Sequence, residues 1–121
     1  MHLTNVVFNL VDNAIKYSSE TPRIEIKTEN RSDNICLFVA DHGIGIDKKY
    51  QERIFDKFYR IPTGNRHDVK GFGLGLNYAK DIVRAHRGKI VVSSIPGKGT
   101  IFIITLKTSI NGEVKGQNIV G

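Results

Sequence analysis

The chain has 121 residues, of which 40% are hydrophobic and 25% are charged, values typical of a folded globular domain and not of a disordered segment. It has no apolar stretch long enough for a membrane-spanning helix or a secretory signal, and its single cysteine excludes an internal disulfide and a structural zinc site. The formal net charge is +6, and residues 48–89 carry 11 basic and 4 acidic side chains, so that window holds +7 and the remainder −1. This local charge disfavours a nucleic-acid-binding tail and leaves two alternatives: a phosphate-bearing ligand or an ordinary solvated basic surface.

The first part of the chain predicts one helix and one hairpin. Apolar residues recur at helical spacing over residues 3–17, which predicts an amphipathic helix. Residues 23–28 alternate between apolar and polar side chains, and residues 35–40 are almost continuously apolar. These two segments predict a hairpin whose second strand is the more buried, with a polar turn at residues 30–34. A loop punctuated by glycines follows at residues 41–46.

The middle of the chain predicts a short helix, a long loop and a second amphipathic helix. The short helix is expected over residues 48–53, and residues 61–70 lack any periodicity, which favours a mobile surface loop long enough to act as a lid. Residues 73–87 carry Leu, Ala, Ile and Val on one helical face. Gly88 is expected to end this helix.

The last part of the chain predicts a second hairpin. Residues 89–94 and 100–107 are expected to be strands, joined by a glycine-containing turn at residues 95–99. The order of elements indicates an α+β fold, a two-layer sandwich with helices on one face of a mostly antiparallel sheet. Residues 1–107 are therefore expected to form one domain, and residues 108–121 a flexible C-terminal tail.

A polar stripe marks the first predicted helix. Asn5, Asn9 and Asn13 recur every four residues and Lys16 follows, so all four lie on roughly one helical face. Amide oxygens are suitable ligands for Mg²⁺, and a lysine can neutralise phosphate oxygens. A helix surface that is rich in asparagine by chance is the alternative.

The sequence DHGIGI, residues 41–46, directly follows the buried strand. Asp41 offers a group that only accepts hydrogen bonds, which suits an exocyclic amine. Adenine carries such an amine where guanine carries a carbonyl. The glycines after Asp41 would allow the backbone to approach a flat base, although a tight turn alone also accounts for this pattern.

Two further glycine-rich motifs are GFGLGL at residues 71–76 and GKGT at residues 97–100. The first opens a predicted helix, where free N–H groups and the helix dipole favour phosphate. It fits neither a P-loop, which needs Lys-Ser or Lys-Thr, nor a Rossmann turn, which needs different glycine spacing. GKGT is also explained by plain turn chemistry, while Thr100 offers a hydroxyl for a base or an ordered water.

Taken in chain order, NLVDNAIKYS, DHGIGI, IFDKFYR, GFGLGL and GKGT resemble the N, G1, F, G2 and G3 boxes of the ATP-binding catalytic domain of sensor histidine kinases. Gyrase-type topoisomerases, heat-shock chaperone ATPases and mismatch-repair ATPases belong to the same superfamily. The resemblance covers residues 1–107 and implies the Bergerat ATP-binding fold. In that fold a mixed, mostly antiparallel sheet lies under three helices, and the nucleotide binds between the helices and a flexible lid.

The resemblance also implies roles for individual side chains. Asn9 and Asn13 are expected to hold Mg²⁺ near the phosphates and Lys16 to bind phosphate oxygens. Asp41 is expected to receive the adenine amino group, with Thr100 supporting it through water. The other residues expected to contact the nucleotide are Tyr17, Gly43, Gly45, Ile46, Phe58, Arg60, Lys70, Gly71, Gly73, Leu74, Gly75 and Leu76.

Within the predicted lid region, Phe55 and Phe58 resemble hinge anchors, and Arg60 resembles a catalytic cation that reaches the terminal phosphate. The glycines of GFGLGL would wrap the phosphates with backbone amides. For Lys70, Arg66 and His67, a solvated loop side chain is an equal alternative.

Position 9 separates branches of the superfamily. The resemblance implies that the hydrolysing relatives and the serine-kinase branch typically carry glutamate at this position as a general base, whereas an amide cannot accept a proton. With Asn9, the domain is expected to bind Mg·ATP, hydrolyse it slowly and act by positioning and charge neutralisation. This matches the histidine-kinase branch, in which the acceptor histidine lies on a separate helical dimerisation domain.

None of the four histidines lies in an acceptor motif, so we expect a fragment of a longer, cytoplasmic kinase region that lacks the upstream strand and the dimerisation domain. The expected partners are ATP, that helical domain and, downstream, a response regulator, with no nucleic acid and no membrane contact. Two alternatives remain. One is a nucleotide-sensing module without phosphoryl transfer, and the other is an ATPase motor, which Asn9 opposes.

Overall fold

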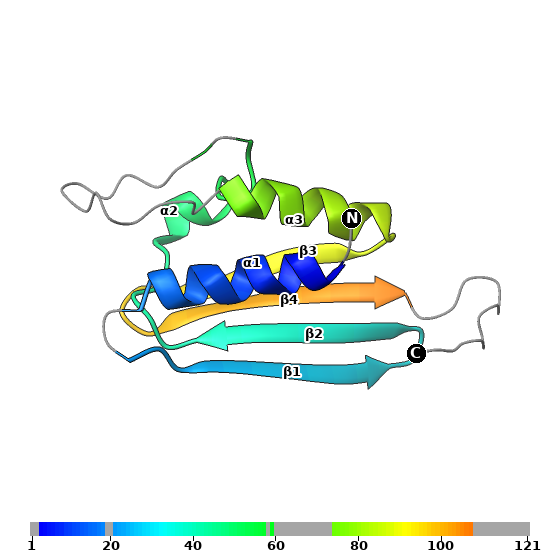
Figure 1. The fold of residues 1–121 in the computed structure, drawn as a ribbon, viewed down its shortest axis with the longest axis horizontal. Helices are drawn as coiled ribbons and strands as arrows, with labels where there is room; N and C mark the ends of the chain where they lie inside the picture. Colours follow the sequence, from blue (N-terminus) through cyan, green and yellow to red (C-terminus); the bar gives the residue numbers. More distant parts are fainter. Residues whose placement is uncertain (1–2, 19–20, 58, 60–73, 108–121) are drawn as a thin grey trace.

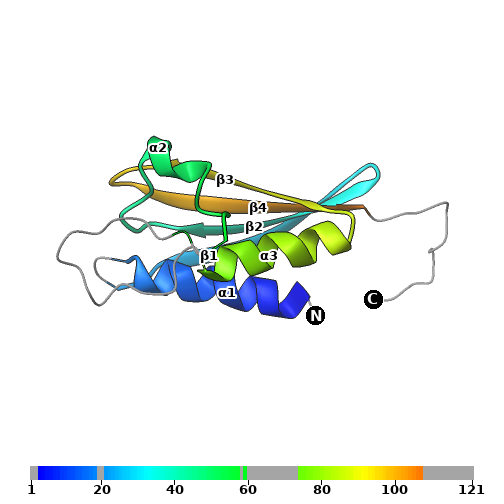
Figure 2. The same ribbon diagram turned by 90° about the horizontal axis from the view of Figure 1, so that it is seen from above.

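The computed structural model describes residues 3–18, 21–57, 59 and 74–107. Helices α1 (Leu3–Lys16) and α3 (Leu74–Ala85) pack side by side on one face of a four-stranded sheet, and the short helix α2 (Lys48–Gln51) lies at one end of the sheet (Figures 1 and 2). The predicted α+β sandwich is confirmed. The expected tail, residues 108–121, and the expected lid loop, residues 61–70, lie outside the described residues.

Two hairpins build the sheet. Strand β1 (Ile24–Arg31) pairs with β2 (Asn34–Asp41), and β3 (Lys89–Ile95) pairs with β4 (Gly99–Lys107). Pairing of β2 with β4 joins the hairpins in the order β1-β2-β4-β3, and each of these pairings is antiparallel. The parallel part of the mixed sheet that the resemblance implies is therefore not among the described strands.

The core lies between the two long helices and the sheet, because each element turns one apolar face inward. Figure 2 shows α1 and α3 on the same side of the sheet; no described helix covers the opposite face. As predicted, β1 is mostly exposed, while β2 contributes buried residues. The core cluster consists of Val6, Leu10, Val39, Ile46, Ile54, Leu76, Ala79, Ile82, Val83, Ile90, Phe102 and Ile104.

Helix α3 ends in a Schellman motif, but the left-handed residue is not the expected glycine. The N–H of Gly88 donates to the carbonyl of Val83 at 2.8 Å, and that of Arg87 donates to Arg84 at 2.9 Å. Arg87 takes the positive φ, 62°. Gly88 is needed for a different reason, since a Cβ there would lie 2.6 Å from the carbonyl oxygen of Thr105. The prediction of where α3 ends was close, and the physical reason assigned to Gly88 was wrong.

Two other predicted boundaries shift by a few residues. The strands of the first hairpin extend to Arg31 and from Asn34, which leaves a two-residue loop where a five-residue turn was expected. Helix α2 ends at Gln51, two residues early, after an N-cap at Asp47 whose carboxylate accepts the N–H of Lys49. Among the described helices, none has the length and apolar character that crossing a membrane requires.

Candidate functional site

Polar residues from three strands meet at one end of the sheet. Asp41 ends β2 and lies opposite Thr100 of β4, which in turn lies opposite Ser94 of β3. All three share the face that carries Val39 and Phe102, because side chains two apart on a strand point the same way. The C-terminal end of α1 reaches the same end of the sheet (Figure 1). The fold thus places an aspartate and two hydroxyls beneath a helix end.

A small cavity opens at this point. Its lining consists of Asn13, Ala14, Tyr17, Asp41, Gly45, Ile46, Thr100 and Phe102, so six residues expected to contact a nucleotide lie around one hollow. The hollow measures about 10 Å³, close to the space that one water molecule needs. A purine is larger, so these side chains must move apart for a base to enter.

The carboxylate of Asp41 is held by backbone donors. Its Oδ1 accepts the N–H of Gly43 at 2.8 Å, and the Thr100 N–H also donates to this carboxylate. Burial raises the pKa of Asp41, and the two backbone N–H groups act in the lowering direction. An ionised group in this position is partly desolvated, and a further donor such as an amine would stabilise its charged form.

Asn13 is the most unusual polar residue of the site. Its side chain is 5% exposed, and its Nδ2 is the one buried side-chain nitrogen or oxygen without a hydrogen-bond partner among the described residues. Buried polar atoms are nearly always paired. Because an amide's nitrogen and oxygen are assigned and not observed, this position suits an anionic oxygen as acceptor or, with the amide reversed, a cation.

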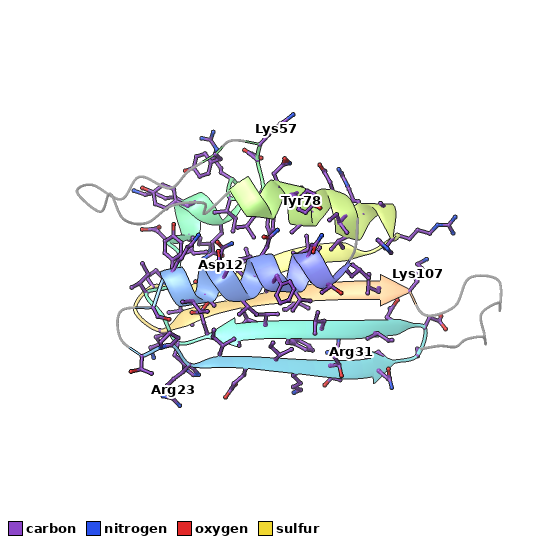
Figure 3. The ribbon with its side chains drawn as sticks, in the orientation of Figure 1. Asp12, Arg23, Arg31, Lys57, Tyr78 and Lys107 are labelled. Atoms are coloured by element: carbon purple, nitrogen blue, oxygen red, sulfur yellow. The ribbon has the colours of Figure 1, made fainter. Side chains whose placement is uncertain are left out.

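Asn9 and Lys16 lie on the same helix. Asn9 is half-buried one turn before Asn13, as the predicted polar stripe requires. Lys16 forms an ion pair with Asp12, with Nζ 3.0 Å from Oδ2 and both side chains exposed; Asp12 is labelled on α1 in Figure 3. Exposed pairs contribute little to stability, so Lys16 can exchange this carboxylate for a phosphate at small cost.

Three glycines at the site pack against protein backbone. A Cβ on Gly43 would collide with the carbonyl oxygen of Tyr17, one on Gly45 with that of Ile95, and one on Gly99 with that of Asp41. Gly45 and Gly99 also have positive φ values, 77° and 137°. Backbone atoms therefore occupy the space that a side chain would need at these positions. This role was not anticipated from the sequence, where Gly43 and Gly45 were expected to allow approach to a base and Gly99 to serve the turn.

A hydrogen-bond network that was missed from the sequence lies beside the cavity. The hydroxyl of Ser94 contacts the N–H of Ile46, the carbonyl of Gly99 and the hydroxyl of Thr100, each at 2.8 Å. Gln51 of α2 donates from Nε2 to the carbonyls of Ile46 at 2.8 Å and Ser94 at 3.1 Å. The sequence carried one signal of this network. Ser94 is the polar residue of the alternating series Ile90, Val92, Ser94, whose side chains share the inward face of the strand.

The remaining predicted residues pack in the core, begin α3 or lie outside the described residues. Phe55 packs edge-on against Phe102, with ring centroids 6.3 Å apart, and Leu76 is fully buried in the core and not part of the cavity lining. Leu74 and Gly75 begin α3. Phe58, Arg60, Lys70, Gly71 and Gly73 lie outside the described residues.

Comparison with known proteins places the chain in one family. Residues 1–110 match the family described as "Histidine kinase-, DNA gyrase B-, and HSP90-like ATPase". The chain is 50% identical over 108 residues to the sensor protein RprX of Bacteroides fragilis and 41% identical over 106 residues to the sensor histidine kinase WalK of Bacillus subtilis. These alignments cover 88% and 86% of the chain but only 21% and 17% of those proteins.

Solved structures agree with this placement. The mycobacterial sensor histidine kinase MprB superposes with a TM-score of 0.74 at 28% identity, covering 85% of this chain and 70% of that one. The catalytic domain of the histidine kinase ThkA superposes with a TM-score of 0.72 at 30% identity, covering 87% of this chain and 65% of that one. The family match, the relatives and the fold are thus those of an ATP-binding catalytic domain of the two-component type. The chain belongs to the histidine kinase-, DNA gyrase B- and HSP90-like ATPase family.

Proposed function

We propose that the chain binds Mg·ATP in the cavity between α1 and the strand ends and donates the γ-phosphoryl group to a histidine on a separate helical domain. The observation that carries this proposal is the unpartnered amide of Asn13, which is buried beside the cavity that Asp41 lines. A phosphate oxygen would accept a hydrogen bond from this Nδ2, or, with the amide reversed, its oxygen would face a magnesium ion. A purely structural asparagine would have a protein partner.

At the base end, Asp41 receives the exocyclic amine of adenine. The carboxylate already accepts backbone donors from Gly43 and Thr100, so its remaining lone pairs select a ligand that carries a donor. Guanine has a carbonyl at that position, so its oxygen would face the Asp41 carboxylate with no proton for a hydrogen bond between them. The site therefore prefers ATP to GTP.

At the phosphate end, Asn9, Asn13 and Lys16 lie along one face of α1. Mg²⁺, held by the amides of Asn9 and Asn13, would neutralise phosphate charge. Lys16 turns from Asp12 to the phosphate oxygens, and Arg60 reaches the terminal phosphate. Asn9 cannot remove a proton from water, so the domain holds ATP for transfer and does not hydrolyse it rapidly.

The proposed partners follow from the reaction. The chain lacks an acceptor-type histidine motif, so the acceptor is supplied by a helical dimerisation domain of the same kinase in the cytoplasm. A response regulator receives the phosphoryl group afterwards.

Mixing the protein with Mg·[γ-³²P]ATP and the helical domain of its own kinase is expected to label that domain on histidine, as acid-labile and base-stable phosphate. Asn13→Ala is expected to remove both ATP binding and labelling. Tight binding of ATP without any labelling would contradict the proposed transfer and favour a nucleotide-sensing module. Rapid ATP hydrolysis without a partner would favour an ATPase motor.

Titration of Asp41 provides a prediction about charge. Burial raises the pKa of this carboxyl above its ordinary value of 3.8, so in the free protein it should protonate at a higher pH than an exposed aspartate. Because an amine donor stabilises only the carboxylate, ATP is expected to lower this pKa again. NMR of the side-chain carboxyl carbon against pH, with and without Mg·ATP, measures both shifts. An identical titration in both states would contradict the placement of adenine.

A further inference from the structure

We infer that Ser94 is a specificity-determining residue, because it fixes the direction in which the hydroxyl of Thr100 donates its proton. This inference rests on the proposed function, since it concerns the choice between ATP and GTP in the same cavity. Ser94 itself does not line that cavity, whereas Thr100 does. Ser94 therefore acts through Thr100 as a positioning residue.

The first step is a count of protons. A serine hydroxyl has one proton to donate and two lone pairs to accept with. The carbonyl oxygen of Gly99, 2.8 Å from Ser94 Oγ, can only accept, so Ser94 donates its proton there. The N–H of Ile46, also at 2.8 Å, can only donate, so it uses one lone pair of Ser94.

The second step concerns Thr100. Its Oγ1 lies 2.8 Å from Ser94 Oγ, and either hydroxyl can in principle be the donor. Since the Ser94 proton is committed to Gly99, the Thr100 hydroxyl must donate to Ser94. Thr100 is 5% exposed, so its hydroxyl has little access to water as an alternative acceptor. Toward the cavity it presents lone pairs only.

The third step joins Thr100 to Asp41. Thr100 lies directly opposite Asp41 on the neighbouring strand, and both line the same cavity. The carboxylate and the oriented hydroxyl therefore form a pair of acceptors. Adenine supplies two N–H groups on one exocyclic nitrogen, which matches such a pair directly or through a water. Guanine supplies another acceptor, which neither residue can satisfy.

Gln51 supports the same arrangement from α2. Its donations to the carbonyls of Ile46 and Ser94 hold the loop after β2 against β3, so the Ile46 N–H stays aligned with Ser94 Oγ. The acceptor role of the Thr100 hydroxyl therefore depends on a hydrogen-bond network that begins at Gln51 of α2.

The test is the ratio of the dissociation constants for GTP and ATP, measured by calorimetry on the whole chain. In Ser94→Ala the Thr100 hydroxyl is free to turn and donate to a guanine carbonyl, so the preference for ATP is expected to fall by about 2-fold to about 10-fold, the range of one neutral hydrogen bond. Ser93→Ala is the matched control. Ser93 is the preceding residue, exposed on the opposite face of β3, and its substitution should leave the ratio unchanged.

Thr100→Val removes the hydroxyl and keeps the shape of the side chain, so it separates a specificity role from a structural one. In the Thr100→Val background, adding Ser94→Ala is expected to leave the ratio where Thr100→Val alone set it. A further fall in the ratio there, or an equal weakening of ATP and GTP binding in Ser94→Ala, would overturn the inference about Ser94. Failure of the unmodified protein to bind either nucleotide would overturn the proposed function itself.

Discussion

Asp41→Asn is expected to weaken ATP binding by about 10-fold to about 100-fold, the range of a hydrogen bond to a charged acceptor. In the native site a carboxylate that only accepts hydrogen bonds faces the adenine amine. Asparagine keeps the shape, but one of its two terminal atoms becomes a donor. Gly43 and Thr100 already direct N–H groups at this side chain, so the asparagine oxygen is claimed by the backbone. Its NH₂ group is then left to oppose the base.

Calorimetry with Mg·ATP at neutral pH measures the loss, and Thr100→Ala provides the comparison. Thr100→Ala removes a neutral second acceptor beside the charged Asp41 carboxylate, so its effect should be several-fold smaller. The fold should tolerate Asp41→Asn, because burial already disfavours the charged carboxylate. Near-equal losses in the two variants would show that adenine is not bound through Asp41.

Gly99→Ala is expected to lower the free energy of unfolding by about 2–5 kcal/mol, which combines backbone strain with overpacking. Gly99 begins β4 with φ at 137°, a conformation that is essentially restricted to glycine. An added Cβ would also meet the carbonyl oxygen of Asp41 and lie 3.0 Å from the Cα of His42. The backbone that carries Asp41 would have to move, so ATP affinity should fall together with stability.

Gly97→Ala is the matched control for this effect. Gly97 lies two residues away in the same turn and also has positive φ, 82°, but a Cβ there would meet nothing within 4 Å. Gly97→Ala should therefore lower the free energy of unfolding only by the strain of the left-handed conformation, about 1 kcal/mol. It should leave ATP affinity unchanged. Urea denaturation of the two variants measures the difference. Equal destabilisation would mean that backbone crowding at Gly99 does not matter.

The elements and the fold class were predictable because they depend on periodicity. The helical spacing of apolar residues in α1, the alternation in the strands and the glycine-rich turns are local patterns. The element that each pattern predicts is compatible with the elements predicted on either side of it. The order β1-β2-β4-β3 was not predictable in this way, since pairing of β2 with β4 joins residues that are 59 (Asp41 and Thr100) to 73 (Asn34 and Lys107) positions apart. The left-handed Arg87 was also missed, because the Schellman geometry fixes the position and the sequence offers glycine one residue later.

The candidate site was predictable as a set of side chains but not as a set of contacts. Asn13, Tyr17, Asp41 and Thr100 were named from their motifs and line one cavity. Their hydrogen-bond partners depend on which strands lie side by side, so neither Ser94 nor Gln51 could be linked to Thr100 and Ile46 from spacing alone. For the same reason, the close contact of Gly43 with the backbone of Tyr17, which is far away in sequence, was not predictable.

The packing of Gly43, Gly45 and Gly99 on backbone limits how this pocket can evolve. A mutation that adds even one methyl group at these positions must displace main chain, so drift there is removed by selection before it can alter ligand choice. Positions whose side chains end in the cavity or behind it, such as Ile46 and Ser94, carry no such restriction. New nucleotide preferences in descendants of this sequence should therefore arise through side-chain exchanges around a fixed glycine framework, and libraries for altered specificity should leave the three glycines untouched.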